Sequence, residues 1–190
     1  LSGKVIKRAN FTSDPDFDGD GHGTHVAGIV AATTNNSLGV ASLGYDTKLI
    51  SGKVLDNNGS GYYSWIASGV IWATDNGAKV INASWGGAGD SITIAQAISY
   101  AYSKGAVFVA AAGNNNIDAT YFFPANATCA DASNPTIDCT LTVASTNKDD
   151  YKSYFSNYGT TIDVTAPGEE IISLRSSKLS DQFSASEYIG

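Results

Sequence analysis

The stretch AVFVAAA at residues 106–112, followed at once by Gly113-Asn114-Asn115-Asn116, decides the fold. Every residue of its first part is apolar, and such a run is typical of a strand buried on both faces of a helix-covered parallel sheet. The abrupt change to glycine and asparagine marks the end of the strand. Working residues of α/β sheets gather in the loops that leave the carboxyl ends of the strands. We therefore expect the loop that begins at Gly113 to belong to the functional site.

Strand and helix patterns alternate on both sides of this stretch. The alternation of apolar and small residues predicts strands at 4–7, 48–55, 79–82, 141–145 and 162–166. Apolar residues at helical spacing predict helices at 25–34, 63–75 and 91–103. This order predicts an α/β fold of three layers, α/β/α, around a mostly parallel central sheet. Two further loops, at 56–61 and 84–87, then also leave the carboxyl ends of strands.

Composition narrows the class of protein. The 190 residues are enough for one domain, and with 43% hydrophobic and 15% charged residues they can bury a substantial core. The net charge is −7 and the lysines and arginines are scattered, which argues against nucleic acid or an anionic membrane as partner. No apolar run approaches the length of a membrane span. Because the sequence contains no methionine, we expect a processed chain or a piece of a longer one.

The two cysteines, Cys129 and Cys139, lie in a polar segment. Their separation suits a disulfide that closes a surface loop, as found in oxidising compartments. Two free thiols are the alternative, whereas zinc is disfavoured because both histidines lie far away in the sequence. The disulfide interpretation predicts a secreted, extracellular protein.

Both histidines of the chain fall in DGDGHGTHVAG at residues 18–28. Histidine is the usual general base near neutral pH, and the glycines around His22 leave room for a substrate backbone. The alternative is a pair of structural histidines at the start of a helix.

A nucleotide-binding domain is the competing α/β function. Gly59-Ser60-Gly61 hints at the dinucleotide fingerprint, but the third glycine would fall at Ser64. The strand that follows ends in Ser84, without the acidic residue that would bind a ribose. Both departures disfavour nucleotide binding.

Four ordered motifs resemble those of the subtilisin-like serine proteases, the subtilases. They are DGHGTHVAG at 20–28, VINASWGG at 80–87, VAAAGN at 109–114 and TAPG at 165–168. The likeness covers nearly the whole chain and is strongest to thermitase-like members. It implies a subtilisin-like fold and a serine endopeptidase that cleaves extended protein or peptide substrates.

The resemblance also assigns roles to residues. His22 matches the general base, Asn114 matches the asparagine of the oxyanion hole, and His25 matches a structural position. Two substrate-binding segments are implied, Gly59-Ser60-Gly61 and Ser84-Trp85-Gly86, between which a peptide would bind as an added strand. Ala111, Ala112 and Gly113 would form one wall of a roomy apolar pocket, which suits large hydrophobic or aromatic side chains.

Two parts of the family pattern do not occur in the printed sequence. No Asp-Thr-Gly or Asp-Ser-Gly precedes His22, and no Gly-Thr-Ser-Met-Ala with the nucleophile is present. We therefore expect residues 1–190 to be the central part of one peptidase domain, a truncated core that is inactive alone. The remaining pieces of that domain or an inhibitory propeptide are expected partners. A catalytically dead homologue that binds proteins is the rival hypothesis.

Calcium is the expected cofactor, at two places. Asp14, Asp16 and Asp18 alternate before a glycine, which suits Ca²⁺, although the pattern of a twelve-residue calcium loop is incomplete and an acidic solvated loop is the alternative. Residues 34–40 resemble the family's high-affinity calcium loop. The resemblance assigns ligands there to the side chain of Asn36 and the carbonyls of Thr34, Leu38 and Val40. A further carboxylate of that site would lie upstream of residue 1.

Overall fold

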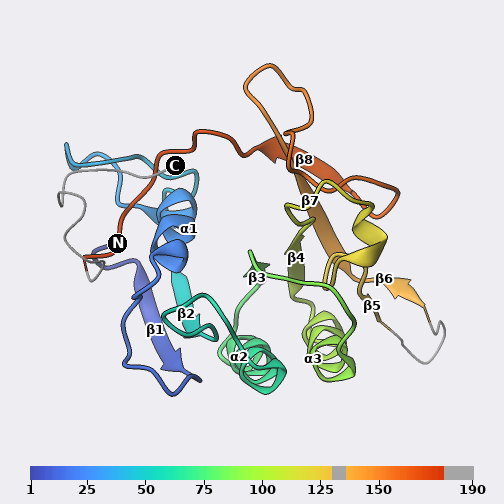
Figure 1. Cartoon of the computed structure of the whole chain (residues 1–190). Coiled ribbons are helices and arrows are strands. Elements are labelled where there is room, and N and C mark those ends of the chain that lie inside the picture. The colour runs from blue at the N-terminus through green and yellow to red at the C-terminus, as the bar shows by residue number, and fades with distance from the viewer. Residues whose placement is uncertain (130–135, 178–190) are drawn as a thin grey trace. The chain divides into compact units, whose positions relative to one another are not determined.

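The computed structural model describes residues 1–129 and 136–177 (Figure 1). Its contacts divide the chain into two compact units. Unit 1 comprises Leu1–Gly69 with the residues from Glu170 onward, and unit 2 comprises Val70–Glu169. Each unit is described by itself, and the assignment of the whole chain to one peptidase domain stays a prediction.

Unit 1 contains a parallel pair of strands, β1 (Val5–Asn10) and β2 (Leu49–Lys53), which lie side by side in Figure 1. Both strands match predicted ones, β1 being longer at its end than expected. Helix α1 (His22–Ala31) belongs to the same unit. The long connection between the two strands therefore contains α1, as expected for a parallel crossover.

Helix α1 begins at His22, and the prediction that it starts at His25 was wrong. The cause is the carboxylate of Asp18, which accepts hydrogen bonds from the N–H of Gly21 at 2.8 Å and the N–H of Thr24 at 2.7 Å. These bonds satisfy N–H groups that lack partners in the first turn of a helix. Asp18 thus extends the helix to the first histidine.

Helix α2 (Tyr63–Asp75) begins in unit 1 and ends in unit 2. Within unit 1 it approaches the end of β2 at Gly69, where an added Cβ would lie 2.2 Å from Cγ1 of Val54. Glycine fits there because the Val54 side chain already occupies the place that a side chain at residue 69 would need.

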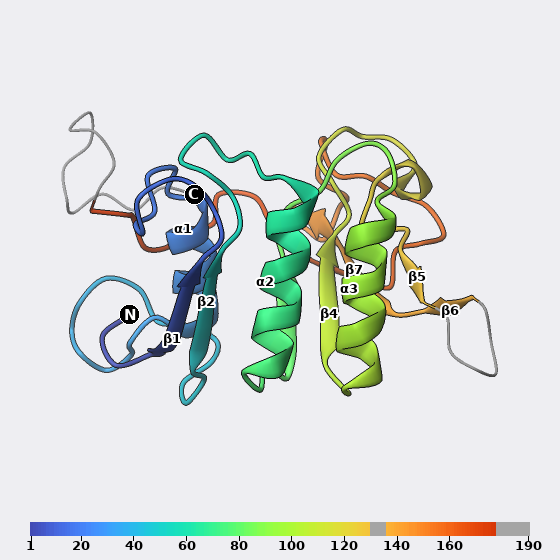
Figure 2. The same cartoon turned by 90° about the horizontal axis from the view of Figure 1, so that it is seen from below.

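Unit 2 is built on a four-stranded parallel sheet with the order β3-β4-β7-β8. The strands are β3 (Val80–Ala83), β4 (Val107–Ala111), β7 (Thr140–Thr146) and β8 (Val164–Pro167). Helix α3 (Ile92–Ser103) packs beside β4 (Figure 2) and is capped by Ser91, whose hydroxyl accepts from the N–H of Ile94. The predicted α/β class and the mostly parallel sheet are confirmed.

The core of unit 2 lies between α3 and β4. Ile94, Ile98 and Phe108 are at most 1% exposed. Burial of each such side chain contributes roughly 1.5–3 kcal/mol. The opposite face of β4 is less covered, because Val107 is 49% exposed, so the prediction of burial on both faces was wrong for the described chain.

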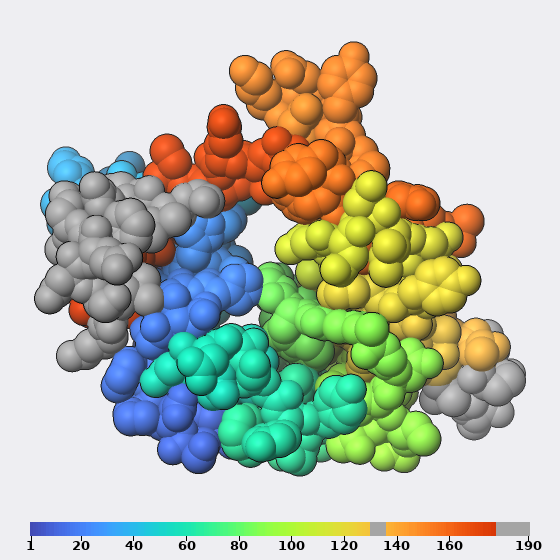
Figure 3. All heavy atoms as spheres, viewed as in Figure 1, coloured from blue at the N-terminus to red at the C-terminus, as the bar shows by residue number. Residues whose placement is uncertain are grey.

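Three short elements of unit 2 were not predicted. They are the 3-10 helix η1 (Ala119–Tyr121) and the antiparallel strands β5 (Thr128–Cys129) and β6 (Ile137–Asp138). A disulfide links Cys129 of β5 to Cys139, the residue after β6, with an S–S distance of 2.07 Å, so the predicted bridge is present. The loop between β7 and β8, orange in Figure 3, projects from its unit and carries the exposed Tyr151 and Tyr154.

Candidate active site

The candidate site in unit 2 lies at the carboxyl ends of β3 and β4. The register pairs Ala83 with Ala110, so the residues that follow each strand leave the sheet next to one another. Between them lies a cavity of about 300 Å³. It is lined by Ser84, Trp85, Gly86, Ala111, Gly113, Asn114, Asn115 and Phe122. Two of the motifs found in the sequence therefore meet in one cavity.

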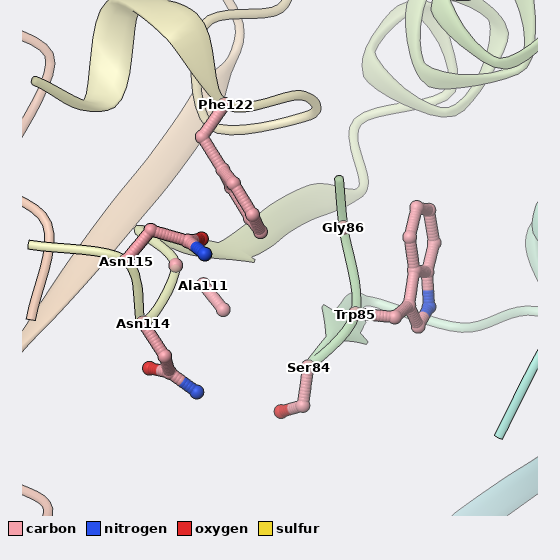
Figure 4. A pocket seen from close by; sticks show the side chains of 8 residues that line it. Ser84, Trp85, Gly86, Ala111, Asn114, Asn115 and Phe122 are labelled. Carbon is pink, nitrogen blue, oxygen red and sulfur yellow. The ribbon is translucent and has the colours of Figure 1, made fainter. Parts of the chain in front are cut away.

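Figure 4 shows how the side chains at this cavity point. Those of Asn114 and Ser84 point to the same side, and Asn114 is exposed. The ring of Trp85 points away from Asn114 and packs edge-on against Phe108, with ring centroids 6.2 Å apart. Trp85 therefore anchors its segment to the core of the unit. The exposed amide of Asn114 can donate a hydrogen bond into the cavity.

Ala112 does not line this cavity, although the sequence placed it in the pocket wall. It is 2% exposed, and its N–H donates to the carbonyl of Val143 on β7. Alternate residues of an extended segment point to opposite sides, so Ala111 and Ala112 cannot both face the cavity. Of the three residues predicted to form the pocket wall, Ala111 and Gly113 line the cavity.

Phe122 and Asn115 line the cavity and were not predicted. The Phe122 ring fits because Gly86 and Gly113 have no side chains: an added Cβ would lie 2.4 Å from its Cε1 atom at Gly86 and 2.8 Å from its Cδ2 atom at Gly113. A pair of backbone hydrogen bonds, each 2.9 Å long, joins Gly87 to Phe123 and holds the ring's segment in place. In the sequence, only the two glycines indicate that a bulky side chain packs here, because Phe122 comes from a distant loop.

His22 lies in unit 1 as the first residue of α1. Its side chain is exposed, and its N–H donates to Oδ1 of Asp20 at 3.1 Å. The role of His22 as general base stays a prediction. Since His22 and Asn114 belong to different units, their joint action stays a prediction.

His25 packs against the C-terminal part of unit 1. Its Nε2 atom lies 3.1 Å from the carbonyl oxygen of Ile171, and its own carbonyl accepts from the hydroxyl of Ser173 at 2.6 Å. Ser173 is fully buried. These contacts agree with a structural role for His25.

The segment Gly59-Ser60-Gly61 belongs to unit 1, whereas Ser84-Trp85-Gly86 belongs to unit 2. Asp56 folds this segment into a turn, because its carboxylate accepts from the N–H groups of Asn58 and Ser60, both at 2.9 Å. Gly59 has a φ of 75°, which favours glycine. The role of these residues as a second substrate-binding segment stays a prediction.

The three aspartates proposed as calcium ligands have separate protein partners. Asp16 forms a 2.9 Å ion pair with Arg8, and Asp14 accepts from the N–H of Asn57 at 2.7 Å. Burial raises the pKa of Asp18, but hydrogen bonds from the Thr24 hydroxyl and from the N–H groups of Gly21 and Thr24 outweigh it, so the pKa of Asp18 is lowered.

Among residues 1–129 and 136–177, no group of three or more acidic, histidine or cysteine side chains could hold a metal ion. Both oxygens of Asp18 accept from the start of α1, and a guanidinium group already neutralises Asp16. The arrangement of Asp14, Asp16 and Asp18 therefore does not fit a calcium site.

Residues 34–40 fit calcium better. Asn35, Ser37 and Gly39 have φ values of 58°, 57° and 59°. The predicted ligands Thr34, Asn36, Leu38 and Val40 alternate with these left-handed residues along the loop. The hydroxyl of Thr34 is buried without a hydrogen-bond partner in the described chain, whereas Oδ1 of Asn36 accepts from the N–H of Leu38 at 3.1 Å. Backbone carbonyl and asparagine oxygens are ligands that Ca²⁺ prefers.

Comparison with known proteins agrees with the geometry. The model of the subtilase family matches residues 5–188. The chain is similar to a thermophilic serine proteinase of Bacillus sp. (strain AK1), with 44% identity over 91% of the chain, and to thermitase of Thermoactinomyces vulgaris, with 43% identity over 91%. It is also similar to the crystal structure of a cold-adapted subtilisin-like serine proteinase, with a TM-score of 0.77 and 32% identity over 92% of the chain.

The chain spans only part of these relatives. It covers 41% of the Bacillus proteinase, 59% of thermitase and 59% of the cold-adapted proteinase. In the part of the chain that the structure describes, no helix is long and apolar enough to cross a membrane.

Proposed function

Because this chain belongs to the subtilase family, we propose that the protein from which it comes is a serine endopeptidase that hydrolyses peptide bonds of extended protein substrates by way of an acyl-enzyme. The observation that carries this proposal is the cavity in which Ser84, Gly86, Gly113 and the exposed Asn114 meet. The names of the similar proteinases support the same activity.

In the proposed mechanism, this chain supplies the base and an oxyanion donor. His22 takes the proton from a serine hydroxyl as its oxygen attacks the substrate carbonyl, and returns it to the leaving amine. The Asn114 amide donates a hydrogen bond to the carbonyl oxygen as it becomes negatively charged. Loss of one such donor lowers the rate by about 10²–10³-fold. The substrate backbone would bind along Ser84-Trp85-Gly86 as an added strand.

The printed 190 residues contain no motif for the nucleophile, so we propose that this chain alone does not hydrolyse peptides. We also propose that the protein is secreted, which the Cys129–Cys139 disulfide supports.

Calcium binding is proposed for residues 34–40 alone. The ligands there would be Thr34, Asn36, Leu38 and Val40, and the bound ion would stiffen the loop that follows α1.

A fluorophosphonate probe, which reacts with activated serines, tests the proposal. The full-length protein encoded by the gene should be labelled at one serine that lies outside these residues, and His22→Ala should suppress the labelling. The 190-residue chain should stay unlabelled. A full-length protein that binds peptides but neither reacts nor hydrolyses them would instead support a catalytically dead binding module.

A further inference from the structure

Asn157 is a buried polar residue that none of the sequence motifs includes. It is 0% exposed, and it follows Ser156 in the connection between β7 and β8. A buried amide is costly unless its polar atoms are hydrogen-bonded. The partners of Asn157 therefore indicate what it does.

The hydrogen-bond partners of its side chain lie in the segment that carries Asn114. Its Nδ2 atom donates to the carbonyl of Ala112 at 2.8 Å. Its Oδ1 atom accepts from the N–H of Asn115 at 2.9 Å and from the N–H of Ile117 at 3.1 Å. One side chain thus binds the backbone on both sides of Asn114.

The backbone of Asn157 adds to this attachment. Its N–H donates to the carbonyl of Gly113 at 2.9 Å. Gly113 has a φ of 100°, and an added Cβ there would lie 2.4 Å from Nδ2 of Asn157. The side chain of Asn157 thus fills the space that Gly113 leaves.

Neighbouring residues continue the same pairing of segments. The N–H of Asn116 donates to the carbonyl of Phe155 at 2.8 Å, and the N–H of Tyr158 donates to the carbonyl of Ile117 at 3.0 Å. Residues 112–117 are therefore held along their length by residues 155–158. The Asn114 side chain, by contrast, is exposed, and Asn114 lines the cavity (Figure 4).

We propose that Asn157 is a positioning residue that fixes the loop at 112–117 so that the amide of Asn114 is aimed at the reacting carbonyl. This inference rests on the proposed function, in which Asn114 is the oxyanion donor. Displacement of a catalytic group by about 1 Å can cost 10²-fold in rate, so the aim of the donor matters. Asn157 itself contacts neither substrate nor reacting atoms.

A double-mutant cycle in the full-length protein tests the inference with a chromogenic peptide substrate. Asn157→Ala should lower kcat about 10- to 100-fold, while KM stays within about threefold, as expected for an interaction made in the transition state. In an Asn114→Ala background, the same substitution should lower kcat less than about threefold, because the donor that it positions is gone.

Asn147→Ala is a matched control. Oδ1 of Asn147 also accepts two backbone N–H groups, those of Asp149 at 2.9 Å and Tyr151 at 3.0 Å, but Asn147 does not line the cavity. This variant should leave kcat unchanged. If Asn157→Ala does not fold, Asn157→Ser, whose hydroxyl can keep part of the hydrogen bonding, should show the same dependence on Asn114 with a smaller loss.

The outcomes separate the inference from the function on which it rests. An inactive wild type, or full activity of Asn114→Ala, would overturn both. Loss of activity in Asn114→Ala together with an unaffected Asn157→Ala, or with equal losses from Asn157→Ala in both backgrounds, would overturn the positioning role alone.

Discussion

Gly28 shows how the absence of one side chain fixes the path of a segment that is far away in the sequence. An added Cβ on this residue of α1 would lie 2.3 Å from Oγ of Ser173 and 2.9 Å from the backbone nitrogen of Leu174. The Ser173 hydroxyl in turn donates to the carbonyl of His25. The C-terminal part of unit 1 can therefore lie directly on the helix that begins with His22.

Gly28→Ala should destabilise the protein. Overpacking lowers the free energy of unfolding by about 1–3 kcal/mol. The higher helix propensity of alanine offsets at most about 1 kcal/mol of this loss. Urea denaturation of both variants measures the difference, with Gly23→Ala on the same helix as the control, because its Cβ would meet Asp18 at an ordinary 3.5 Å. Equal stabilities of the two variants would contradict the packing described for Gly28.

Phe122→Ala should change the preference of the proposed peptidase for the substrate residue before the cleaved bond. The ring occupies space beside Gly86 and Gly113, so its removal enlarges the cavity. We expect kcat/KM for a large aromatic residue to rise about tenfold or more relative to alanine at that position. Peptides that differ only there measure the ratio, and an unchanged ratio would show that the cavity does not bind this side chain.

Where a motif was local, the sequence located residues that line the cavity, and their roles stay predictions. Gly113 and Asn114 follow the apolar run directly, and the structure places both at the cavity. Phe122 could not be predicted, because it reaches the cavity only through the pairing of Gly87 with Phe123. Ala112 was misplaced because the alternation of side chains at the strand end was not applied to it.

At the scale of elements, the start of α1 depends on a carboxylate outside the helix. Burial raises the pKa of Asp18, but hydrogen bonds from the Thr24 hydroxyl and from the N–H groups of Gly21 and Thr24 outweigh it and hold the pKa below its usual value of 3.8. A lowered pKa means that the ionised form stabilises the folded state. Its contribution is complete above the unfolded pKa and disappears as the pH falls through the folded one.

Asp18→Asn should therefore flatten the dependence of the unfolding free energy on pH below about pH 4. Urea denaturation at pH 5, 4 and 3 would give the slopes for the wild type and the variant. Asp16→Asn is a useful comparison, because its ion pair with Arg8 is about half exposed and such pairs contribute little. Identical slopes for Asp18→Asn and the wild type would contradict the role given to Asp18.

The two candidate calcium segments, residues 34–40 and residues 14–18, differ in the expected effect of a substitution on stabilisation by Ca²⁺. Millimolar Ca²⁺ should raise the melting temperature. A bound ion whose free concentration is 100 times its Kd adds about 2.7 kcal/mol to the free energy of unfolding. Asn36→Ala should reduce this increase, whereas Asp14→Asn should leave it unchanged. Melting curves in Ca²⁺ and in a chelator measure both effects. If only Asp14→Asn abolishes the increase, the assignment to residues 34–40 is wrong.

Long elements were predictable because their apolar patterns are strong. The strands β4 and β7 and the helices α2 and α3 occur within a few residues of the predicted ranges. The boundary of α1 was missed because capping by Asp18 depends on a side chain three residues before the N-cap position. The two-residue strands β5 and β6 are too short to leave a periodic pattern, although the cysteine spacing indicated that their segment is closed.

For the whole molecule, the sequence predicted the family and the fold class, and both are confirmed. It could do so because four motifs in order carry information along the entire chain. The sequence could not assign the neighbours of each motif, since these depend on strand register and on loops far away in the chain. The cluster around Asn157 is the clearest case, because its contacts join residues 40 or more positions apart.

The kcat of the full-length protein and of its Asn114→Ala and His22→Ala variants, on one peptide substrate, tests the central claim most directly. We expect hydrolysis by the wild type, a loss of about 10²–10³-fold in Asn114→Ala, and a larger loss in His22→Ala. Circular dichroism should show that both variants remain folded. Folded variants that hydrolyse the peptide as fast as the wild type would contradict the assignment of His22 as general base and Asn114 as oxyanion donor.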